Sequence, residues 1–213
     1  MLIQKENRST SIVHYMRTFV PSITINKKTH IMTNFNIPTR EEVSTGNQAI
    51  FDNLKKVVGF VPNLYATIAY SDTALGNYLD FQNAKTSLTN KEKEVVNLVV
   101  SQVNGCAYCL SAHTAISKMN GFTEEHILEL RQGFSSSDAK FDALVKTTKS
   151  IALNKGKVDE TTLEAFFNAG YTKATLVDVI LAVGDKTVMN YLHNLTQIEI
   201  DFPLAKDIET VEA

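Results

Sequence analysis

Apolar residues recur at helical spacing along most of this chain, with helix-starting and helix-ending signals between the stretches. The clearest stretch begins at Thr89, because Thr89 and Glu92 have the spacing of a capping box. Apolar residues follow at helical spacing as far as Val103, and Asn104-Gly105 ends the run. No stretch shows the alternation of apolar and polar residues that is typical of a strand. The sequence therefore predicts an all-α fold.

The same signals predict the remaining helices. They are expected at about 47–58, 64–70, 74–81, 90–103, 106–119, from 124, 138–154, 159–168 and 174–198. Residues 94–113 and 175–194 share much of their apolar pattern, which is compatible with two related helical halves. Generic amphipathic helices would match equally well, so both interpretations stay open.

The first 31 residues differ in composition from the rest. They carry five Lys or Arg residues against one acidic residue, and Met32 precedes the first helical segment. We expect residues 1–31 to be an N-terminal extension outside the core, residues 32–203 to form one all-helical domain, and residues 204–213 to form a C-terminal tail. An organellar presequence is an alternative interpretation of the extension.

Bulk composition limits the classes of function. Hydrophobic residues make up 44% of the chain, which suffices for a packed core. A net charge of -2 gives no electrostatic reason to expect binding to nucleic acid or an anionic membrane. No apolar run reaches the length of a membrane span, and no secretory signal is recognisable. We therefore expect a cytoplasmic protein, in which a cysteine pair is catalytic or metal-binding rather than a structural disulfide.

Both cysteines of the chain lie three residues apart, in Cys106-Ala107-Tyr108-Cys109. On a helix Cys106, Cys109 and His113 occupy one narrow stripe, and the two cysteines are close enough to form a disulfide. Gly105 ends the preceding helix, so both cysteines are expected in the first turn of a new one. Free N–H groups and the helix dipole there favour thiolates of lowered pKa. His113, one turn after Cys109, is placed to take its proton.

Other interpretations of these residues were weighed. A c-type haem site needs His directly after the second cysteine, and this chain has Leu110 there, so a haem site is discarded. A thioredoxin-like motif should follow a strand, but here a predicted helix precedes the cysteines, which disfavours that motif. A zinc site formed by Cys106, Cys109 and His113, with His126 as a possible fourth ligand, stays open, as does an inert buried pair. Tyr108 is expected to face away from the cysteines, and the remaining histidines, His193 among them, are expected to be structural.

The spacing of Glu94, Cys106-Ala107-Tyr108-Cys109 and His113 resembles the signature of the AhpD-like alkylhydroperoxidases of the carboxymuconolactone decarboxylase superfamily. Three further segments resemble the peroxidase-related branch of that family, so the likeness spans about Pro38 to Pro203. These segments are Gly59-Phe60-Val61-Pro62-Asn63-Leu64, Asn190-Tyr191-Leu192-His193-Asn194 and Asp201-Phe202-Pro203.

The resemblance implies an AhpD-like helical bundle that assembles into homo-oligomers, commonly dimers, trimers or hexamers. It implies an oxidoreductase, a thiol peroxidase that reduces organic hydroperoxides through a dithiol/disulfide cycle. Such an enzyme needs no haem, metal or other cofactor, but an external dithiol or redox protein must reduce it again. Cys109 would attack the peroxide, Cys106 would resolve, and His113 with Glu94 would relay the proton. The decarboxylases of the superfamily lack the paired cysteines, so lactone decarboxylation is not expected.

Tyr108 departs from the family pattern, since the best-studied members carry His between the cysteines. Two alternatives to a peroxidase remain. One is a dithiol partner that exchanges disulfides with other proteins, and the other is a zinc-binding helical module.

Overall fold

The computed structural model describes residues 35–208 and confirms the all-α prediction. These residues form a short 3₁₀ helix at Arg40–Glu42, nine α-helices and no strand. The α-helices are α1 (Thr45–Val58), α2 (Asn63–Ile68), α3 (Ala74–Gln82), α4 (Asn90–Val103), α5 (Ala107–Met119), α6 (Glu124–Gln132), α7 (Ala139–Leu153), α8 (Glu160–Asn168) and α9 (Lys173–Thr196). The predicted extension, residues 1–31, and the last five residues of the predicted tail lie outside the described residues.

The helix starts follow the predicted caps. Thr89 Oγ1 accepts the Glu92 N–H at 3.2 Å, and Glu92 Oε2 accepts the Thr89 N–H at 2.8 Å, which completes the capping box. Thr123 and Thr172 cap α6 and α9 in the predicted way. The last helix ends two residues earlier than expected, because Gln197 adopts a left-handed backbone with φ of 50°.

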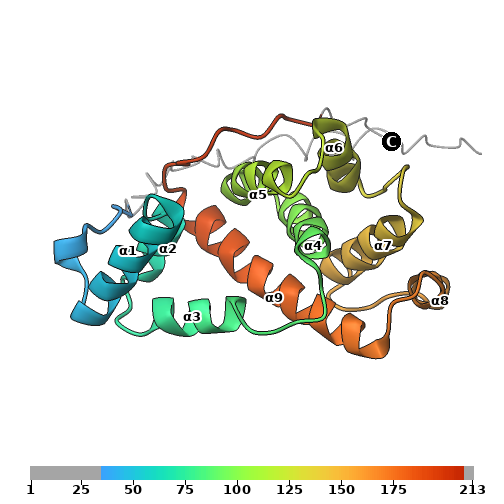
Figure 1. The fold of residues 1–213 in the computed structure, drawn as a ribbon, viewed down its shortest axis with the longest axis horizontal. Coiled ribbons are helices and arrows are strands. Elements are labelled where there is room, and N and C mark those ends of the chain that lie inside the picture. Colours follow the sequence, from blue (N-terminus) through green and yellow to red (C-terminus); the bar gives the residue numbers. More distant parts are fainter. Residues whose placement is uncertain (1–34, 209–213) are drawn as a thin grey trace, which may run out of the picture. The chain divides into compact units, whose positions relative to one another are not determined.

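Helix α4 is the centre of the fold. It packs against α5, α6, α7 and α9, which surround it in Figure 1. A helix that is enclosed on several sides must be apolar on all of them. Five apolar residues of α4 are accordingly buried in one core with residues of α6, α7, α8 and α9: Val95, Val96, Leu98, Val99 and Val100.

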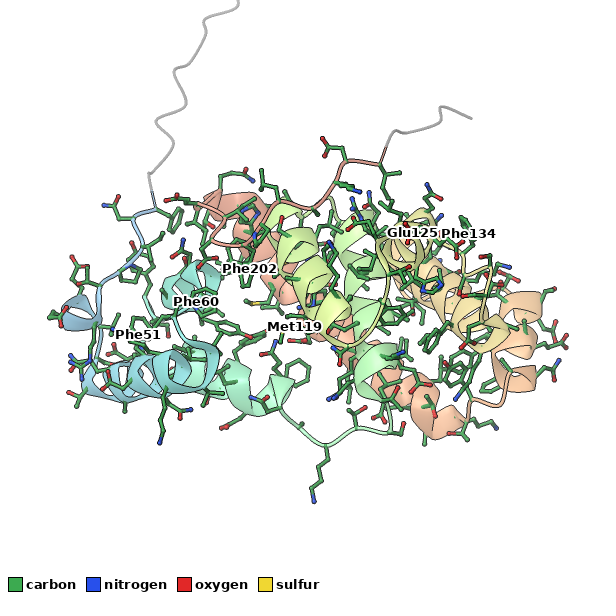
Figure 2. The ribbon with its side chains drawn as sticks, turned by 45° about the horizontal axis from the view of Figure 1, so that its top comes forward. Phe51, Phe60, Met119, Glu125, Phe134 and Phe202 are labelled. Atoms are coloured by element: carbon green, nitrogen blue, oxygen red, sulfur yellow. The ribbon has the colours of Figure 1, made fainter. Side chains whose placement is uncertain are left out.

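A second cluster of buried residues lies where α2, α5 and α9 meet the segment that follows α9. It contains both cysteines with Leu64, Tyr78, Tyr108, Met189 and Ile198. Asp201 Oδ2 accepts the Asn63 N–H at 2.7 Å, which fixes this segment on the start of α2. Phe202 packs on Phe60 with ring centroids 5.6 Å apart, and Figure 2 shows the two rings together.

The hydrophobic helices of this part of the chain are not individually suited to cross a membrane. No single helix within residues 35–208 is both long and apolar enough. Only α8 and α9 taken together pass that test, and they are separated by a bend of 114°.

The turn between α4 and α5 is a Schellman motif. Cys106 N–H donates to the Ser101 carbonyl at 3.0 Å, and Gly105 N–H donates to the Gln102 carbonyl at 3.2 Å. Gly105 has a φ of 62°, in the left-handed region that other residues enter only with strain. This turn lets Cys106 close one helix and begin the next.

Replacing Gly105 by Ala should therefore destabilise the protein by about 1–2 kcal/mol, because a Cβ disfavours the left-handed backbone. The matched control is Gly76→Ala in α3, where an added Cβ meets only Ile50, at an ordinary 3.7 Å. The control should be neutral or stabilising by up to about 1 kcal/mol, because alanine is the better helix former. Urea unfolding measures both free energies. Equal losses of stability in the two variants would contradict this account of the turn.

Candidate active site

Cys106 is the N-cap of α5 rather than its first helical residue, which corrects the predicted helical stripe. Its backbone is extended, with φ of -92° and ψ of 98°, because the glycine turn has just released it from α4. Its sulfur accepts the Cys109 N–H at 3.3 Å. The stripe therefore holds for Cys109 and His113, whereas Cys106 reaches Cys109 through the cap. Both cysteines are free thiols and buried.

The two thiols differ in acidity, and only one follows the prediction. The hydrogen bond from the Cys109 thiol is the largest of several effects that together lower the pKa of Cys106 to about 5; His193 and the Cys109 backbone N–H add to it, and burial opposes it. The pKa of Cys109 is raised, chiefly by that same hydrogen bond and then by burial. The expectation of a lowered pKa at both cysteines is thus wrong for Cys109. One N-cap site favours one anion, and the sulfur of Cys106 occupies it.

Glu94 and His113 are brought together as expected, from α4 and α5. Nδ1 of His113 lies 2.9 Å from Glu94 Oε2, and both side chains are nearly buried. Asn97 also donates to Glu94, at 3.1 Å. Burial raises the pKa of Glu94, but the charge and hydrogen bond of His113, with Asn97 and the charge of Lys186, outweigh it and leave a net lowering. Because the carboxylate accepts, Nδ1 of His113 carries a proton, and Nε2 is left for other chemistry.

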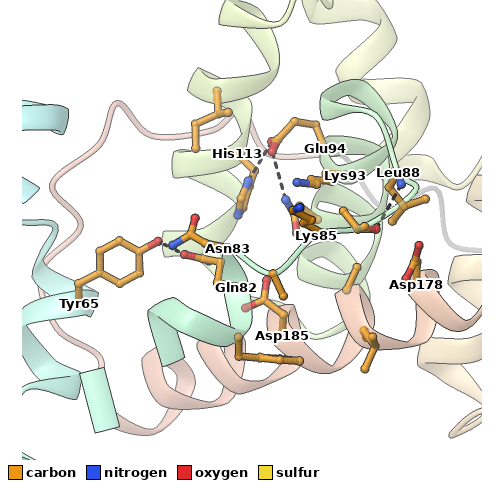
Figure 3. Close-up of a pocket in the computed structure, with 17 residues that line it drawn as sticks. Tyr65, Gln82, Asn83, Lys85, Leu88, Lys93, Glu94, His113, Asp178 and Asp185 are labelled. Atoms are coloured by element: carbon orange, nitrogen blue, oxygen red, sulfur yellow. Dashed lines mark hydrogen bonds and ion pairs between the residues drawn. The ribbon is translucent and has the colours of Figure 1, made fainter. Parts of the chain in front are cut away.

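A cavity of about 360 Å³ opens beside this pair. Figure 3 shows Glu94 and His113 on one side of it, Tyr65 and Gln82 on another, and Asp178 and Asp185 along α9. The apolar lining comes from Phe81, Leu88, Ile116, Leu181 and Ala182. Burial is the main reason that the pKa of Tyr65 rises to about 12, and the nearby charge of Cys109 contributes. Tyr65 lines the cavity and also packs against the cluster of buried residues that contains Cys109.

Helix α9 contributes residues that the sequence reasoning missed. Lys186, Asn190 and His193 are buried along one face of this helix, at helical spacing. Asn190 donates to Ser101 Oγ at 3.1 Å, and hydrogen bonding with Asn190 favours the Cys109 thiolate. The charge of Lys186 lowers the pKa of both Glu94 and Cys109. Polar residues recurring on the buried face of an apolar helix were the signal that could have found them.

Tyr108 was expected to face away from the cysteines. It is instead buried next to them, in the same cluster. Its hydroxyl accepts the Leu64 N–H at 3.2 Å, and its ring packs on His193 and Phe202. The pKa of Tyr108 is raised, first by burial and then by the nearby carboxylate of Asp201. Tyr108 thus joins the start of α2 to the segment after α9.

The zinc alternative finds no preformed site in this part of the protein. Within residues 35–208 no group of three or more His, Cys, Asp and Glu side chains is arranged to hold a metal ion. His126, the suggested fourth ligand, lines a separate cavity with Lys91 and Phe122.

Residues 72–136 match the model of the carboxymuconolactone decarboxylase family, and this range contains Glu94, both cysteines and His113. The fold is that of the alkylhydroperoxidase AhpD core. An uncharacterized peroxidase-related protein with this core, from Ralstonia eutropha JMP134, superposes with a TM-score of 0.72 at 18% identity, over 81% of this chain and 94% of its own. The chain therefore resembles the carboxymuconolactone decarboxylase family in this segment and shares the fold of the AhpD core.

Two further proteins resemble this chain, one in sequence and one in structure. The uncharacterized protein YdfG of Bacillus subtilis (strain 168) is 27% identical over 120 residues, which are 54% of this chain and 76% of YdfG. The debrominase Bmp8, in complex with 2,3,4-tribromopyrrole, superposes with a TM-score of 0.66 at 12% identity, over 80% of this chain and 94% of its own. At such identities the structural likeness establishes the fold alone.

The lowered pKa of Glu94 gives a pH-dependent contribution to stability. A carboxyl whose pKa is depressed in the folded state stabilises the fold above its unfolded pKa and loses this effect as pH falls through the folded pKa. Glu94→Gln should therefore cost about 1–3 kcal/mol at pH 7. Urea unfolding should show this difference from the native protein shrinking once the pH falls below 4.5, the ordinary value for the group.

The control for this measurement is Glu124→Gln, which removes an exposed ion pair with Lys118. Exposed pairs contribute little, so the control should change stability by less than about 1 kcal/mol. A Glu94→Gln cost that stayed constant down to acid pH would show that the charge of Glu94 does not contribute.

Proposed function

We propose that this protein is a thiol-dependent peroxidase that reduces organic hydroperoxides through a dithiol/disulfide cycle of Cys109 and Cys106. The observation that carries the proposal is the contact between the two cysteines, at 3.3 Å from the Cys109 N–H to the Cys106 sulfur, beside the Glu94–His113 pair. Two thiols in contact can cycle to a disulfide with little movement. A histidine held by a carboxylate is a suitable proton acceptor next to them.

Cys109 is the attacking residue in this proposal. It lies one helical turn before His113, which lines the cavity together with Tyr65. Its raised pKa means that it must lose a proton before it reacts, and His113 Nε2 is the group available to take it. Lys186 and Asn190 then favour the thiolate that forms.

The chemical steps balance without a cofactor. The Cys109 thiolate attacks the distal oxygen of the hydroperoxide, the O–O bond breaks, and the alkoxide takes a proton to leave as the alcohol. Cys109 is then a sulfenic acid. Cys106 attacks its sulfur, an S–S bond forms, and hydroxide leaves and becomes water. An external dithiol returns both cysteines to thiols.

The cavity supports an organic peroxide rather than hydrogen peroxide alone. Its apolar lining, Phe81, Leu88, Ile116, Leu181 and Ala182, would accept an alkyl or aryl group, and Glu94 with His113 provides the polar end. We therefore expect cumene hydroperoxide to react faster than hydrogen peroxide.

The reduced protein should consume cumene hydroperoxide in stopped-flow experiments, and Cys109→Ser should slow this reaction at least about 100-fold, because the nucleophile is lost. Cys106→Ser should still react once but should not turn over. Its product, a sulfenic acid at Cys109, can be trapped with dimedone and located by mass spectrometry. An unchanged rate in Cys109→Ser, or dimedone on Cys106 in the wild-type protein, would contradict the assignment.

Two other outcomes would redirect the proposal. Fast disulfide exchange with a reduced protein dithiol, together with inertness toward hydroperoxide, would indicate a redox partner. If the protein released bromide from a bromopyrrole faster than it consumed peroxide, its substrate would instead be of the kind bound by the debrominase Bmp8, which has a similar fold.

We also propose that the protein forms homo-oligomers through the outer face of α9. This face is apolar and exposed, with residues at helical spacing: Val177, Ile180, Leu181, Val188, Tyr191 and Leu195. Val188→Asp should lower the molar mass measured by light scattering, because it puts a charge on the buried surface of the oligomer. The control Val57→Asp alters a valine on α1 that is more exposed than Val188, and it should leave the mass unchanged. A native protein that is monomeric at micromolar concentration would refute this assembly.

A further inference from the structure

A second histidine near the cysteine pair, His193, belongs to α9, whereas His113 belongs to α5. It projects from α9 into the cluster that contains Cys106, Tyr108, Met189 and Ile198, and only 4% of it is exposed. Its ring lies 5.3 Å from that of Tyr108. The hydrogen bonds of this buried histidine determine which of its ring nitrogens can accept a proton.

The contacts of His193 fix its tautomer. Nε2 lies 3.2 Å from the carbonyl oxygen of Ile198. A carbonyl only accepts, so Nε2 must carry the proton of this bond. In the neutral ring Nδ1 is then a bare acceptor, and it is buried without a hydrogen-bond partner among the described residues. A buried acceptor without a partner calls for a functional explanation.

The polar group that His193 Nδ1 can serve is the thiol of Cys106. Hydrogen bonding with His193, and its charge, lower the pKa of Cys106. The carbonyl of Ile198 holds the ring from behind, as Glu94 holds that of His113. The same physical arrangement, a thiol with an oriented imidazole, thus occurs at both cysteines.

We propose that His193 is the proton acceptor of Cys106, so that the dithiol has one histidine for each sulfur. His113 with Glu94 serves Cys109, and His193 with the Ile198 carbonyl serves Cys106. The role of this second histidine in turnover rests on the proposed peroxidase function, but the proton transfer itself does not.

The step assigned to His193 is the resolution of the sulfenic acid. Nδ1 takes the thiol proton of Cys106, and the resulting thiolate attacks the sulfur of Cys109. The S–S bond forms as the S–O bond breaks, and the departing hydroxide receives the proton from the imidazolium as water. The histidine returns to its neutral form, so each cycle leaves it unchanged.

Other titratable groups surround Cys106 and must be separated from His193. Cys109 and Tyr108 approach from α5, and Lys186 from α9. The segment after α9 supplies Asp201, whose carboxylate lies near Tyr108, and Glu94 with His113 lies beyond Cys109. Cys109 has the largest influence, so a decisive titration must remove its thiol.

The test uses the full chain with Cys109→Ser, which leaves Cys106 as the single thiol. The ultraviolet absorbance of its thiolate, followed against pH, gives its ionisation without the need for a reagent to enter the core. Adding His193→Gln keeps a donor for the Ile198 carbonyl but removes the base. The thiolate fraction at a pH below the midpoint should then fall at least about tenfold, because the apparent pKa rises by one or more.

The reciprocal experiment separates a proton acceptor from a merely structural residue. In Cys106→Ser, where Cys109 is the single thiol, His193→Gln should leave the titration unchanged and His113→Gln should shift it. The proposal would be overturned if His193→Gln left the apparent pKa of Cys106 unchanged, or if it shifted the pKa of both cysteines equally. If His193→Gln fails to fold, nitrogen NMR of the His193 ring in the Cys109→Ser protein decides. Nδ1 must gain a proton as the Cys106 thiolate appears, and an Nδ1 without this coupling refutes the role.

Peroxide consumption is measured separately on the wild-type protein. A protein inert to cumene hydroperoxide whose Cys106 still depends on His193 would refute the peroxidase and retain this inference. A protein that consumes cumene hydroperoxide but whose Cys106 titrates independently of His193 would support the peroxidase and refute this inference.

Discussion

The bond from the Cys109 N–H to the sulfur of Cys106 organises this site. It exists because Gly105 lets the chain leave α4 and enter α5 within one Schellman turn, with Cys106 as the shared residue. The cap places only the sulfur of Cys106 against the N–H groups at the start of α5, so the two cysteines have different surroundings. The hydrogen bond between their thiols then makes the larger contribution to their difference in pKa.

The second requirement is a buried carboxylate that stays charged. Glu94 lies on α4, the helix with the most enclosed surface, where desolvation alone would favour its neutral form. His113, Asn97 and Lys186 reverse that preference from three different helices. The core thus does two things at once: it supplies the apolar packing of α4, and it holds a charge at a position where water screens it poorly. A charge in such surroundings orients its histidine far more firmly than a surface pair would.

The helices and their caps could be predicted, because each is encoded locally or at regular spacing; Thr89 and Glu92, for example, lie within one turn. The Glu94–His113 contact was predicted only from the resemblance to a known family. The surroundings of Cys106 could not be predicted in the same way. Cys106 was expected in the first turn of a helix because Gly105 ends the preceding one, and the extended backbone of Cys106 is visible only in three dimensions. His193 stands 87 positions after Cys106 in the chain, and only the packing of α9 on α5 brings them together.

Tyr108 connects these observations. A histidine at this position, between the cysteines, would have been a base carried by the same helix. The structure uses the position instead to join α2, through the Leu64 N–H, to the segment after α9, through the ring of Phe202. That segment begins with Ile198, whose carbonyl orients the ring of His193. With tyrosine at this position, α5 has no histidine between the cysteines. The same tyrosine stabilises the segment that orients His193, the proposed proton acceptor on α9. A substitution that seemed to weaken the site is consistent with a site whose second base has moved to another helix.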